Sequence, residues 1–335
     1  MPGHARRPGR PALTTAVYVT YPIPDPGLPI LREHFEVRLH DSETKPTADE
    51  IAEAAAGCPG ILTLIRDLID AALMDRLPGL RAIANYGVGY DNIDIAAATE
   101  RGIVVTNTPD VLTDATADLA MALLLAVARR LGEGERMVRG GAFRGWTPTL
   151  LVGADVTGAT LGLVGFGRIA AALGRRAQGF GMRLLHTARG DHLEADQLGS
   201  KRVELDRLLA ESDFVSIHVP LTPETHHLID RAALAKMKPT AFLINTARGP
   251  VVDEAALADA LAGGGIAGAG LDVYEREPEV HPGLLQLDNV VLLPHLGSAT
   301  VGTRAEMSRV AATNLVAALR GERPPNPVNP EVLGG

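Results

Sequence analysis

The chain has 335 residues, 46% of them apolar and 21% charged, with a formal net charge of −8. This length favours two domains over one core. Because both signs of charge are spread along an acidic chain, we expect neither nucleic acid nor an anionic membrane as the main partner. The single cysteine, Cys58, excludes an internal disulfide framework and a multi-cysteine metal site, and we predict no bound metal.

The start of the chain, MPGHARRPGRPA, is basic and rich in Pro and Gly, with no apolar segment behind it. We interpret residues 1–12 as a disordered arm, with a targeting peptide as the weaker alternative. The longest apolar run, residues 119–128, is shorter than the roughly 20 residues that cross a bilayer. We therefore expect a cytoplasmic location and no membrane partner.

Strand-like apolar runs alternate with helical stretches twice along the chain. The first series is TAVYVT, FEVRLH, GILTLI, RAIANY and GIVVTN; the second is ATLGLVG, MRLLH, DFVSIHV, TAFLINT, IAGAGLDV and NVVLLPH. Strands that alternate with helices indicate parallel sheets covered on both faces. The predicted fold class is therefore α/β, with two doubly wound parallel-sheet domains.

Three helical features stand out in chain order. Thr47 and Glu50 have the spacing of a capping box at the start of a helix. A long, largely apolar helical stretch is expected over residues 113–138, either as a core helix or as one that also packs against a second subunit. A final helix is expected over residues 299–320, followed by an extended Pro-rich tail.

A glycine-rich loop follows the first strand of the second series. Gly165, Gly167 and Ala170 form a G-x-G-x-x-A pattern between a strand and a helix that begins near residue 168. The first glycine permits a tight turn, and the second lets the backbone approach a pyrophosphate at the helix N-terminus. The pattern favours a dinucleotide site, with an ordinary strand-to-helix turn as the alternative.

The next strand ends in an unusual turn, MRLLHTARGD. A dinucleotide-binding unit usually has an acidic residue here, about 20 residues after the loop, to hold the adenosine ribose. This chain has Thr187, Ala188 and Arg189 instead. Either the loop is not a dinucleotide site, or it serves a different cofactor.

Three later strands each lead to a functional side chain. These are Arg248 after FLINTA, Glu277 reached through Asp272, and His295 after VVLLP. Ligands of parallel sheets bind at the carboxyl ends of the strands. Arg can donate two parallel hydrogen bonds to a carboxylate, His can exchange a proton near neutral pH, and Glu can orient the imidazole. Each of these residues alone could have an ordinary structural role. Because all three occur beside a dinucleotide loop, together they favour a site for hydride transfer.

The motifs NYGVGYDNID, GLVGFGRIA, HVPLTPETHHLI, LINTARGPVVDEAAL, AGAGLDVYEREP and LLPHLGSAT resemble those of the D-isomer-specific 2-hydroxyacid dehydrogenases in order and spacing. The resemblance covers nearly the whole chain after the basic arm. It implies a Rossmann NAD(P)-binding domain over residues 111–297, with a dimerisation arm. This domain would be inserted into a flavodoxin-like substrate domain built from residues 13–110 and 298–335.

The resemblance also implies residue roles. Arg248 would bind the 2-oxo acid, Glu277 would hold the imidazole, and His295 would be the acid–base. Substrate contacts would also come from Leu64, Val88 and Gly89. Cofactor contacts would come from Thr116, Gly165, Phe166, Gly167, Arg168, Ile169, Thr187, Ala188, Arg189, Val219, Pro220, Thr225, Thr246, Ala247, Asp272 and Gly297.

Within this family, the stretch FRGWTPTLLVGADVTGATLG most resembles the glyoxylate and hydroxypyruvate reductases. There a tryptophan of the arm can reach the neighbouring subunit's substrate site, and Trp146 matches it; ordinary packing in the arm is the alternative. We therefore expect a homodimer that reduces a small 2-oxo acid. Two alternatives are a phosphoglycerate dehydrogenase and a dinucleotide-sensing corepressor. The predicted substrate loop has no cluster of Lys and Arg to hold a substrate phosphate, which disfavours the first.

The turn MRLLHTARGD then predicts which cofactor is preferred. The family's acidic ribose-binding position falls at about Ala188, where the absence of a carboxylate removes repulsion of a 2′-phosphate. Arg189 would bind that phosphate and Thr187 would add a hydroxyl donor. We predict that NADP(H) is preferred and NAD(H) possible. The alternative is that Arg189 points into solvent while Asp191 reaches back to the ribose.

Overall fold

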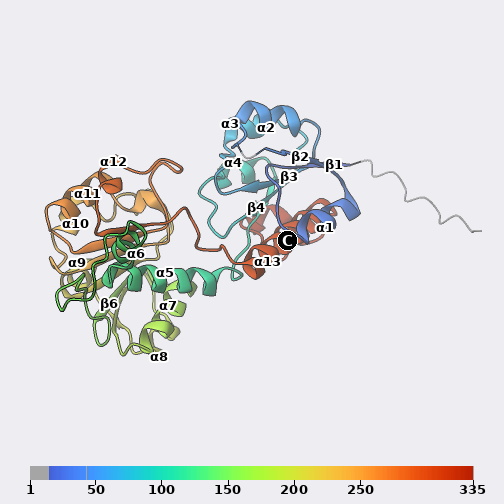
Figure 1. Ribbon diagram of the computed structural model, residues 1–335. Coiled ribbons are helices and arrows are strands. Elements are labelled where there is room, and N and C mark those ends of the chain that lie inside the picture. The colour runs from blue at the N-terminus through green and yellow to red at the C-terminus, as the bar shows by residue number, and fades with distance from the viewer. Residues whose placement is uncertain (1–14, 43, 335) are drawn as a thin grey trace, which may run out of the picture. The chain divides into compact units, whose positions relative to one another are not determined.

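The computed structural model describes residues 15–42 and 44–334 (Figure 1). Contacts divide them into two compact units: unit 1, up to residue 111 and from residue 301 onward, and unit 2, residues 112–300. The predicted basic arm, residues 1–12, lies outside the described residues. None of the helices in the described ranges combines the length and apolar character that crossing a membrane requires.

Unit 1 is built on a five-stranded parallel sheet in the order β2-β1-β3-β4-β5, the order of a flavodoxin-like fold. Its strands are β1 (Ala16–Val19), β2 (Glu36–Leu39), β3 (Gly60–Leu64), β4 (Ala82–Tyr86) and β5 (Val104–Thr106). Its helices are α1 (Gly27–His34), α2 (Ala48–Ala54), α3 (Ala71–Asp75), α4 (Ile95–Glu100) and α13 (Val301–Leu319), with a final 3₁₀ turn η2 (Pro330–Leu333).

Both ends of the described chain contribute to unit 1. Figure 1 shows the red α13 beside the blue α1, and the Gly27 N–H donates to Ser308 Oγ at 3.0 Å. The capping box is present at α2: Thr47 Oγ1 accepts from the Glu50 N–H, and the Glu50 carboxylate accepts from the Thr47 N–H. The final helix spans Val301–Leu319, close to the predicted range.

Unit 2 contains a seven-stranded parallel sheet in the order β12-β11-β10-β9-β6-β7-β8. Its strands are β6 (Thr160–Val164), β7 (Arg183–Thr187), β8 (Lys201–Arg202), β9 (Phe214–Ile217), β10 (Phe242–Asn245), β11 (Gly268–Leu271) and β12 (Val290–Leu292). Its helices are α5 (Thr113–Ala128), α6 (Leu131–Arg139), α7 (Arg168–Gln178), α8 (Leu193–Gln197), α9 (Leu205–Glu211), α10 (Arg231–Leu234), η1 (Gly249–Val251), α11 (Glu254–Ala262) and α12 (Pro282–Leu285). The predicted fold class, two doubly wound parallel-sheet domains, is confirmed.

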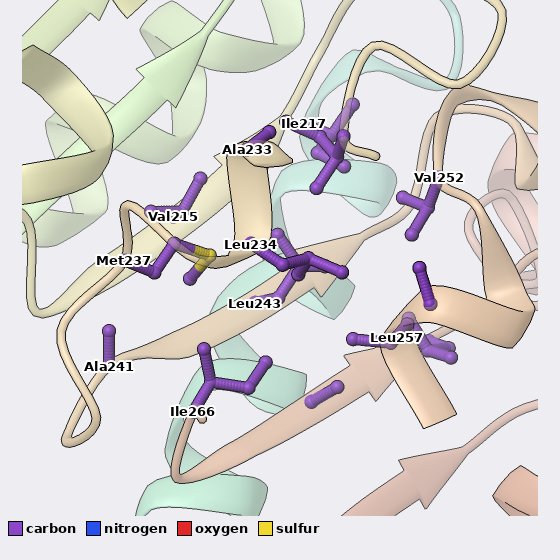
Figure 2. Packing of buried hydrophobic residues seen from close by; sticks show 14 of the residues in the cluster. Val215, Ile217, Ala233, Leu234, Met237, Ala241, Leu243, Val252, Leu257 and Ile266 are labelled. Atoms are coloured by element: carbon purple, nitrogen blue, oxygen red, sulfur yellow. The ribbon is translucent and has the colours of Figure 1, made fainter. Parts of the chain in front are cut away.

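Alternating strand residues fill two apolar layers, one on each face of this sheet. Leu243 packs with side chains of α9, α10 and α11, while its neighbours Phe242 and Ile244 pack with α5 and α7 on the other face. Figure 2 shows Val215 and Leu234 within the first layer. The strand order reverses between β6 and β9, so the carboxyl edge there is a topological switch point, where such sheets bind ligands.

The single helical stretch predicted over residues 113–138 is wrong in one respect. It is two helices, because α5 ends at Ala128 and Arg130 adopts a left-handed conformation with φ 53°. The Arg130 guanidinium donates to both Glu133 carboxylate oxygens at 2.8 and 2.7 Å, which stabilises the break. Gly132, the second residue of α6, is a poor helix former close to the break.

Candidate active site

His295 and Glu277 form a hydrogen-bonded pair in unit 2. His295 lies just after β12 and Glu277 in the loop after β11. The His295 Nδ1–H donates to Glu277 Oε2 at 2.9 Å, since an ionised carboxylate can only accept. The other carboxylate oxygen accepts from the Tyr274 N–H at 3.1 Å. Nδ1 is therefore occupied, and Nε2 is the imidazole nitrogen left for a substrate.

Asp272 fixes the backbone that carries this histidine. His295 has φ 54°, a left-handed conformation unusual for a residue with a side chain. Its N–H donates to the Asp272 carbonyl at 2.9 Å, and the N–H groups of Leu296 and Gly297 donate to the Asp272 carboxylate at 2.6 and 2.8 Å. Burial raises the pKa of Asp272, while these N–H groups and the neighbouring imidazole oppose the rise.

Arg248 lies in the short turn between the end of β10 at Asn245 and η1. The Asn245 side chain holds this turn, donating to the Arg248 carbonyl at 2.9 Å and accepting from the Ala247 N–H at 3.0 Å. The next residue must be glycine, because a Cβ on Gly249 would lie 1.9 Å from the Tyr274 carbonyl carbon. This close approach brings the Arg248 turn against the loop that leads to Glu277.

The glycine loop between β6 and α7 has the geometry that its sequence predicts. Gly165 has φ +86°, and a Cβ there would lie 2.7 Å from Val219 Cγ1. Gly167 caps the N-terminus of α7, and a Cβ there would meet no atom within 4 Å. The Gly165 N–H donates to Thr187 Oγ1 at 3.0 Å, which ties the loop to the end of β7. The Phe166 side chain is buried, with its ring centroid 4.8 Å from that of His186.

The turn after β7 carries the residues predicted to select the cofactor. Thr187 and Ala188 are partly buried, whereas Arg189 is exposed. Asp191 is fully exposed and its carboxylate accepts from Arg202 Nη1 at 3.1 Å. Asp191 is thus engaged by a neighbouring cation in this structure.

Other predicted cofactor residues also lie at the carboxyl edge of this sheet or beside it. Thr246 is buried, and its hydroxyl has no hydrogen-bond partner among residues 15–42 and 44–334. Thr116 Oγ1 donates to the Gly297 carbonyl at 3.1 Å. Thr225 Oγ1 donates to the Pro220 carbonyl at 2.6 Å, so it braces its own loop. Of the remaining predicted residues, Arg168 and Ile169 begin α7, Val219 follows β9 and Ala247 follows β10.

These features fit a dinucleotide. The glycine loop cannot accept a side chain at Gly165, and the first turn of α7 presents backbone N–H groups. The Thr246 hydroxyl has no hydrogen-bond partner among the described residues. Within the described part of the chain, no three His, Cys, Asp or Glu side chains are grouped to hold a metal ion. Gly165, Gly167 and Thr246 are thus the residues that would hold the cofactor.

The predicted substrate contacts Leu64, Val88 and Gly89 belong to unit 1: Leu64 is the last residue of β3, and Val88 and Gly89 follow β4 at the carboxyl edge of the same sheet. All three are partly buried. Trp146 belongs to unit 2, in the irregular segment after α6, and is 80% exposed.

Known proteins match the chain over most of its length. The family model described as D-isomer specific 2-hydroxyacid dehydrogenase, NAD binding domain, matches residues 121–297. A glyoxylate reductase of Thermococcus onnurineus is 51% identical over 322 residues, which cover 95% of this chain and 96% of that protein. The chain belongs to the D-isomer-specific 2-hydroxyacid dehydrogenase family. The expected membership is therefore confirmed.

Solved structures agree with membership in the D-2-hydroxyacid dehydrogenases. A Thermus thermophilus protein superposes with a TM-score of 0.88 at 49% identity, covering 94% of this chain and all of that chain. An NADPH-dependent glyoxylate/hydroxypyruvate reductase from Sinorhizobium meliloti, in complex with NADP and malonate, has a TM-score of 0.85 at 38% identity, covering 94% and 96%. As a member of this family, the chain is an NAD(P)-dependent oxidoreductase with a reductase role.

Sequence reasoning missed Asn245, whose side chain shapes the Arg248 turn. A signal was present in the sequence: FLIN places a polar residue at the end of an otherwise apolar strand, and the structure buries it fully. A buried amide needs hydrogen-bond partners, and at a strand end these are the backbone groups of the following loop. A similar pattern occurs in β4, where Asn85 is a buried polar residue just before the loop of residues 87–90.

Proposed function

We propose that this chain is an NADPH-preferring reductase that converts glyoxylate and hydroxypyruvate to glycolate and D-glycerate. The observation that carries the proposal is the His295–Glu277 pair, with Nε2 available, at the same sheet edge as the glycine loop and Arg248. The choice of substrates is supported by two relatives named glyoxylate reductase, whose sequences are 51% and 52% identical to this chain.

In the proposed reaction, unit 2 binds the cofactor and unit 1 contributes to binding the substrate. The substrate carboxylate is held by Arg248 and by the backbone N–H groups of Val88 and Gly89. Reduced nicotinamide, when bound, supplies the hydride that reaches C2 of the oxo acid. His295 donates its Nε2 proton to the C2 oxygen, and Glu277 stabilises the imidazolium before this transfer. Arg248 stabilises the negative charge that develops on the same oxygen.

A steady-state panel tests this activity. Glyoxylate, hydroxypyruvate, pyruvate and phosphohydroxypyruvate are each assayed with NADPH and with NADH. We expect glyoxylate and hydroxypyruvate with NADPH to give the highest kcat/KM. A preference for phosphohydroxypyruvate would identify a phosphoglycerate dehydrogenase, and no turnover with any pair would reject the reductase proposal.

The proposed cofactor preference rests on the turn after β7. Ala188 carries no charge that would repel a 2′-phosphate. The exposed Arg189 guanidinium can donate two parallel hydrogen bonds to that phosphate. The engagement of Asp191 by Arg202 supports the same interpretation, because it leaves the ribose position without a dedicated carboxylate. A charge-assisted contact of this kind contributes about 1.5–3 kcal/mol, or roughly a ten- to hundredfold preference for NADPH.

Substituting Arg189 tests the preference. We expect Arg189→Ala to raise KM for NADPH by roughly tenfold or more, the loss of one charge-assisted contact, while KM for NADH stays nearly constant. Arg183→Ala is the matched control, since Arg183 is an exposed arginine at the opposite end of the same strand. Equal efficiency with the two cofactors in the unmodified enzyme would contradict the prediction. A weaker NADH affinity in Asp191→Asn would favour the alternative in which Asp191 serves the ribose.

A further inference from the structure

The loop after β4, residues 87–90, has its carbonyl groups anchored by side-chain amides. The Asn85 Nδ2 donates to the Gly89 carbonyl at 2.6 Å and to the Gly87 carbonyl at 3.4 Å. The Asn107 Nδ2, from the segment after β5, donates to the Val88 carbonyl at 2.8 Å. The Gly87 carbonyl also accepts from the Thr108 N–H at 3.0 Å, and the Tyr90 carbonyl from the Ile93 N–H at 3.0 Å.

The N–H side of this loop is different. Among the residues that the structure describes, the N–H groups of Val88 and Gly89 donate to no protein acceptor. In a planar trans peptide, the carbonyl of one residue and the N–H of the next point in opposite directions. Anchoring the carbonyls of Gly87 and Val88 therefore aims these two N–H groups away from the amides. Neighbouring N–H groups presented together favour binding of an anion.

Contacts within unit 1 hold Asn85 by its side chain and Asn107 by its backbone. Asn85 is fully buried, and its Oδ1 lies 3.5 Å from Asn92 Nδ2, which also donates to the carbonyls of Leu64 and Asp67. The backbone carbonyl of Asn107 accepts from the Asn314 amide at 3.0 Å. These contacts present Nδ2 of Asn85 toward the loop.

We propose that Asn85 and Asn107 are positioning residues that hold the loop in the conformation that binds the substrate carboxylate. The inference rests on the proposed function, in which Val88 and Gly89 bind that carboxylate. A neutral amide suits this task, because a carboxylate at either position could not donate to the loop carbonyls and would add a negative charge behind the anion site. Asparagine supplies the same shape without that charge.

The experiment measures binding of oxamate, an unreactive carboxylate analogue of the substrate, to the NADPH-loaded enzyme by calorimetry. We expect Asn107→Asp to weaken oxamate binding by roughly 10- to 100-fold, through misdirected N–H donors and added charge, while the Kd for NADPH changes less than about twofold. Asn85→Asp should act in the same direction. Asn107→Ala removes the amide without adding charge, and it should also weaken oxamate binding in case the aspartate variants do not fold.

Asn329→Asp is the matched control. Asn329 is a buried amide of unit 1 that bonds Val105, Ile103 and Thr99 and makes no contact with residues 87–90. This variant should lower the melting temperature and leave oxamate affinity nearly unchanged. Unchanged oxamate affinity in folded Asn107→Asp and Asn107→Ala would overturn the inference alone. An unmodified enzyme that neither binds oxamate nor reduces any 2-oxo acid would overturn the proposed function, and the inference with it.

Discussion

His295 combines a partly exposed imidazole with a constrained backbone. A left-handed conformation costs a residue with a side chain on the order of 1–3 kcal/mol. Three hydrogen bonds from residues 295–297 to Asp272, two of them to its carboxylate, offset this cost, since each contributes roughly 0.5–3 kcal/mol. The backbone of His295 is therefore set before any substrate arrives, and only its side chain depends on Glu277.

Removal of the imidazole tests its assigned role. We expect His295→Ala to lower kcat by a factor on the order of 10²–10⁴, the range for loss of a general acid. The Kd for NADPH, measured by fluorescence, should stay close to that of the unmodified enzyme. Turnover at the unmodified rate at neutral pH would rule out His295 as the proton donor.

Glu277 is expected to act through the imidazole, given the 2.9 Å contact between Oε2 and Nδ1. Glu277→Gln keeps the shape and removes the charge that favours the protonated ring. Because reduction requires a protonated His295, the rate of the variant should decline at a lower pH than that of the unmodified enzyme. The pH profile of kcat/KM for glyoxylate measures this, and superimposable profiles would contradict the role.

At the scale of elements, the strand ends determine where chemistry is possible. The alternation of apolar runs was enough to predict parallel strands, and three of these strands end next to Arg248, Glu277 and His295. The pairing of His295 with Glu277 was predictable because motif order places both at one sheet edge. The break at Arg130 was not, because it depends on an ion pair with Glu133. The pattern FLIN marks Asn245 as a polar residue at a strand end, but the backbone groups that its amide bonds depend on loop conformation, which the pattern does not encode.

The end of β9 illustrates how a strand end can affect stability. His218 follows this strand, its Nε2 lies 2.9 Å from Ser216 Oγ, and burial lowers its pKa from 6.5 to about 4. Between these pH values the unfolded chain binds a proton at this position that the folded chain does not, so folding stability falls as pH decreases from 6.5 toward 4.

His218→Gln should weaken this pH dependence, because glutamine can accept from Ser216 without titrating. Urea unfolding of both proteins at pH 7 and pH 5 measures the difference. We expect the free energy of unfolding to decrease more between these pH values in the unmodified protein than in the variant. Equal decreases would show that the imidazole is not kept neutral by the fold.

For the whole molecule, the segment from α6 to residue 152 presents apolar side chains without burying them. Val138, Phe143, Trp146 and Val152 are between 49% and 80% exposed, and no residue of α6 is buried. Isolated exposed apolar residues are ordinary, but several along one segment indicate an interface. We therefore expect a homodimer formed through this segment, residues 131–152, which we call the arm, as closed two-fold assemblies are the most common.

Light scattering tests this assembly. We expect a particle of roughly twice the 35.2 kDa chain mass at micromolar concentration, and we expect Phe143→Glu to shift it toward the single chain. Leu193→Glu is the matched control, because Leu193 is a 73% exposed apolar residue of the same unit outside the arm. A monomeric unmodified protein would contradict the prediction.

The division of unit 1 between the two ends of the chain has a consequence for synthesis on the ribosome. Unit 2 is one continuous stretch, residues 112–300, and its contacts are complete once that stretch has emerged. Unit 1 cannot complete its packing until α13 has been synthesised. This helix covers α1, and its residues Leu315 and Leu319 lie against Gly60 of β3. The apolar surface that α13 covers stays exposed to solvent while unit 2 is translated. The nascent chain thus completes its second unit before its first, and chaperone binding during translation should concentrate on the early strands.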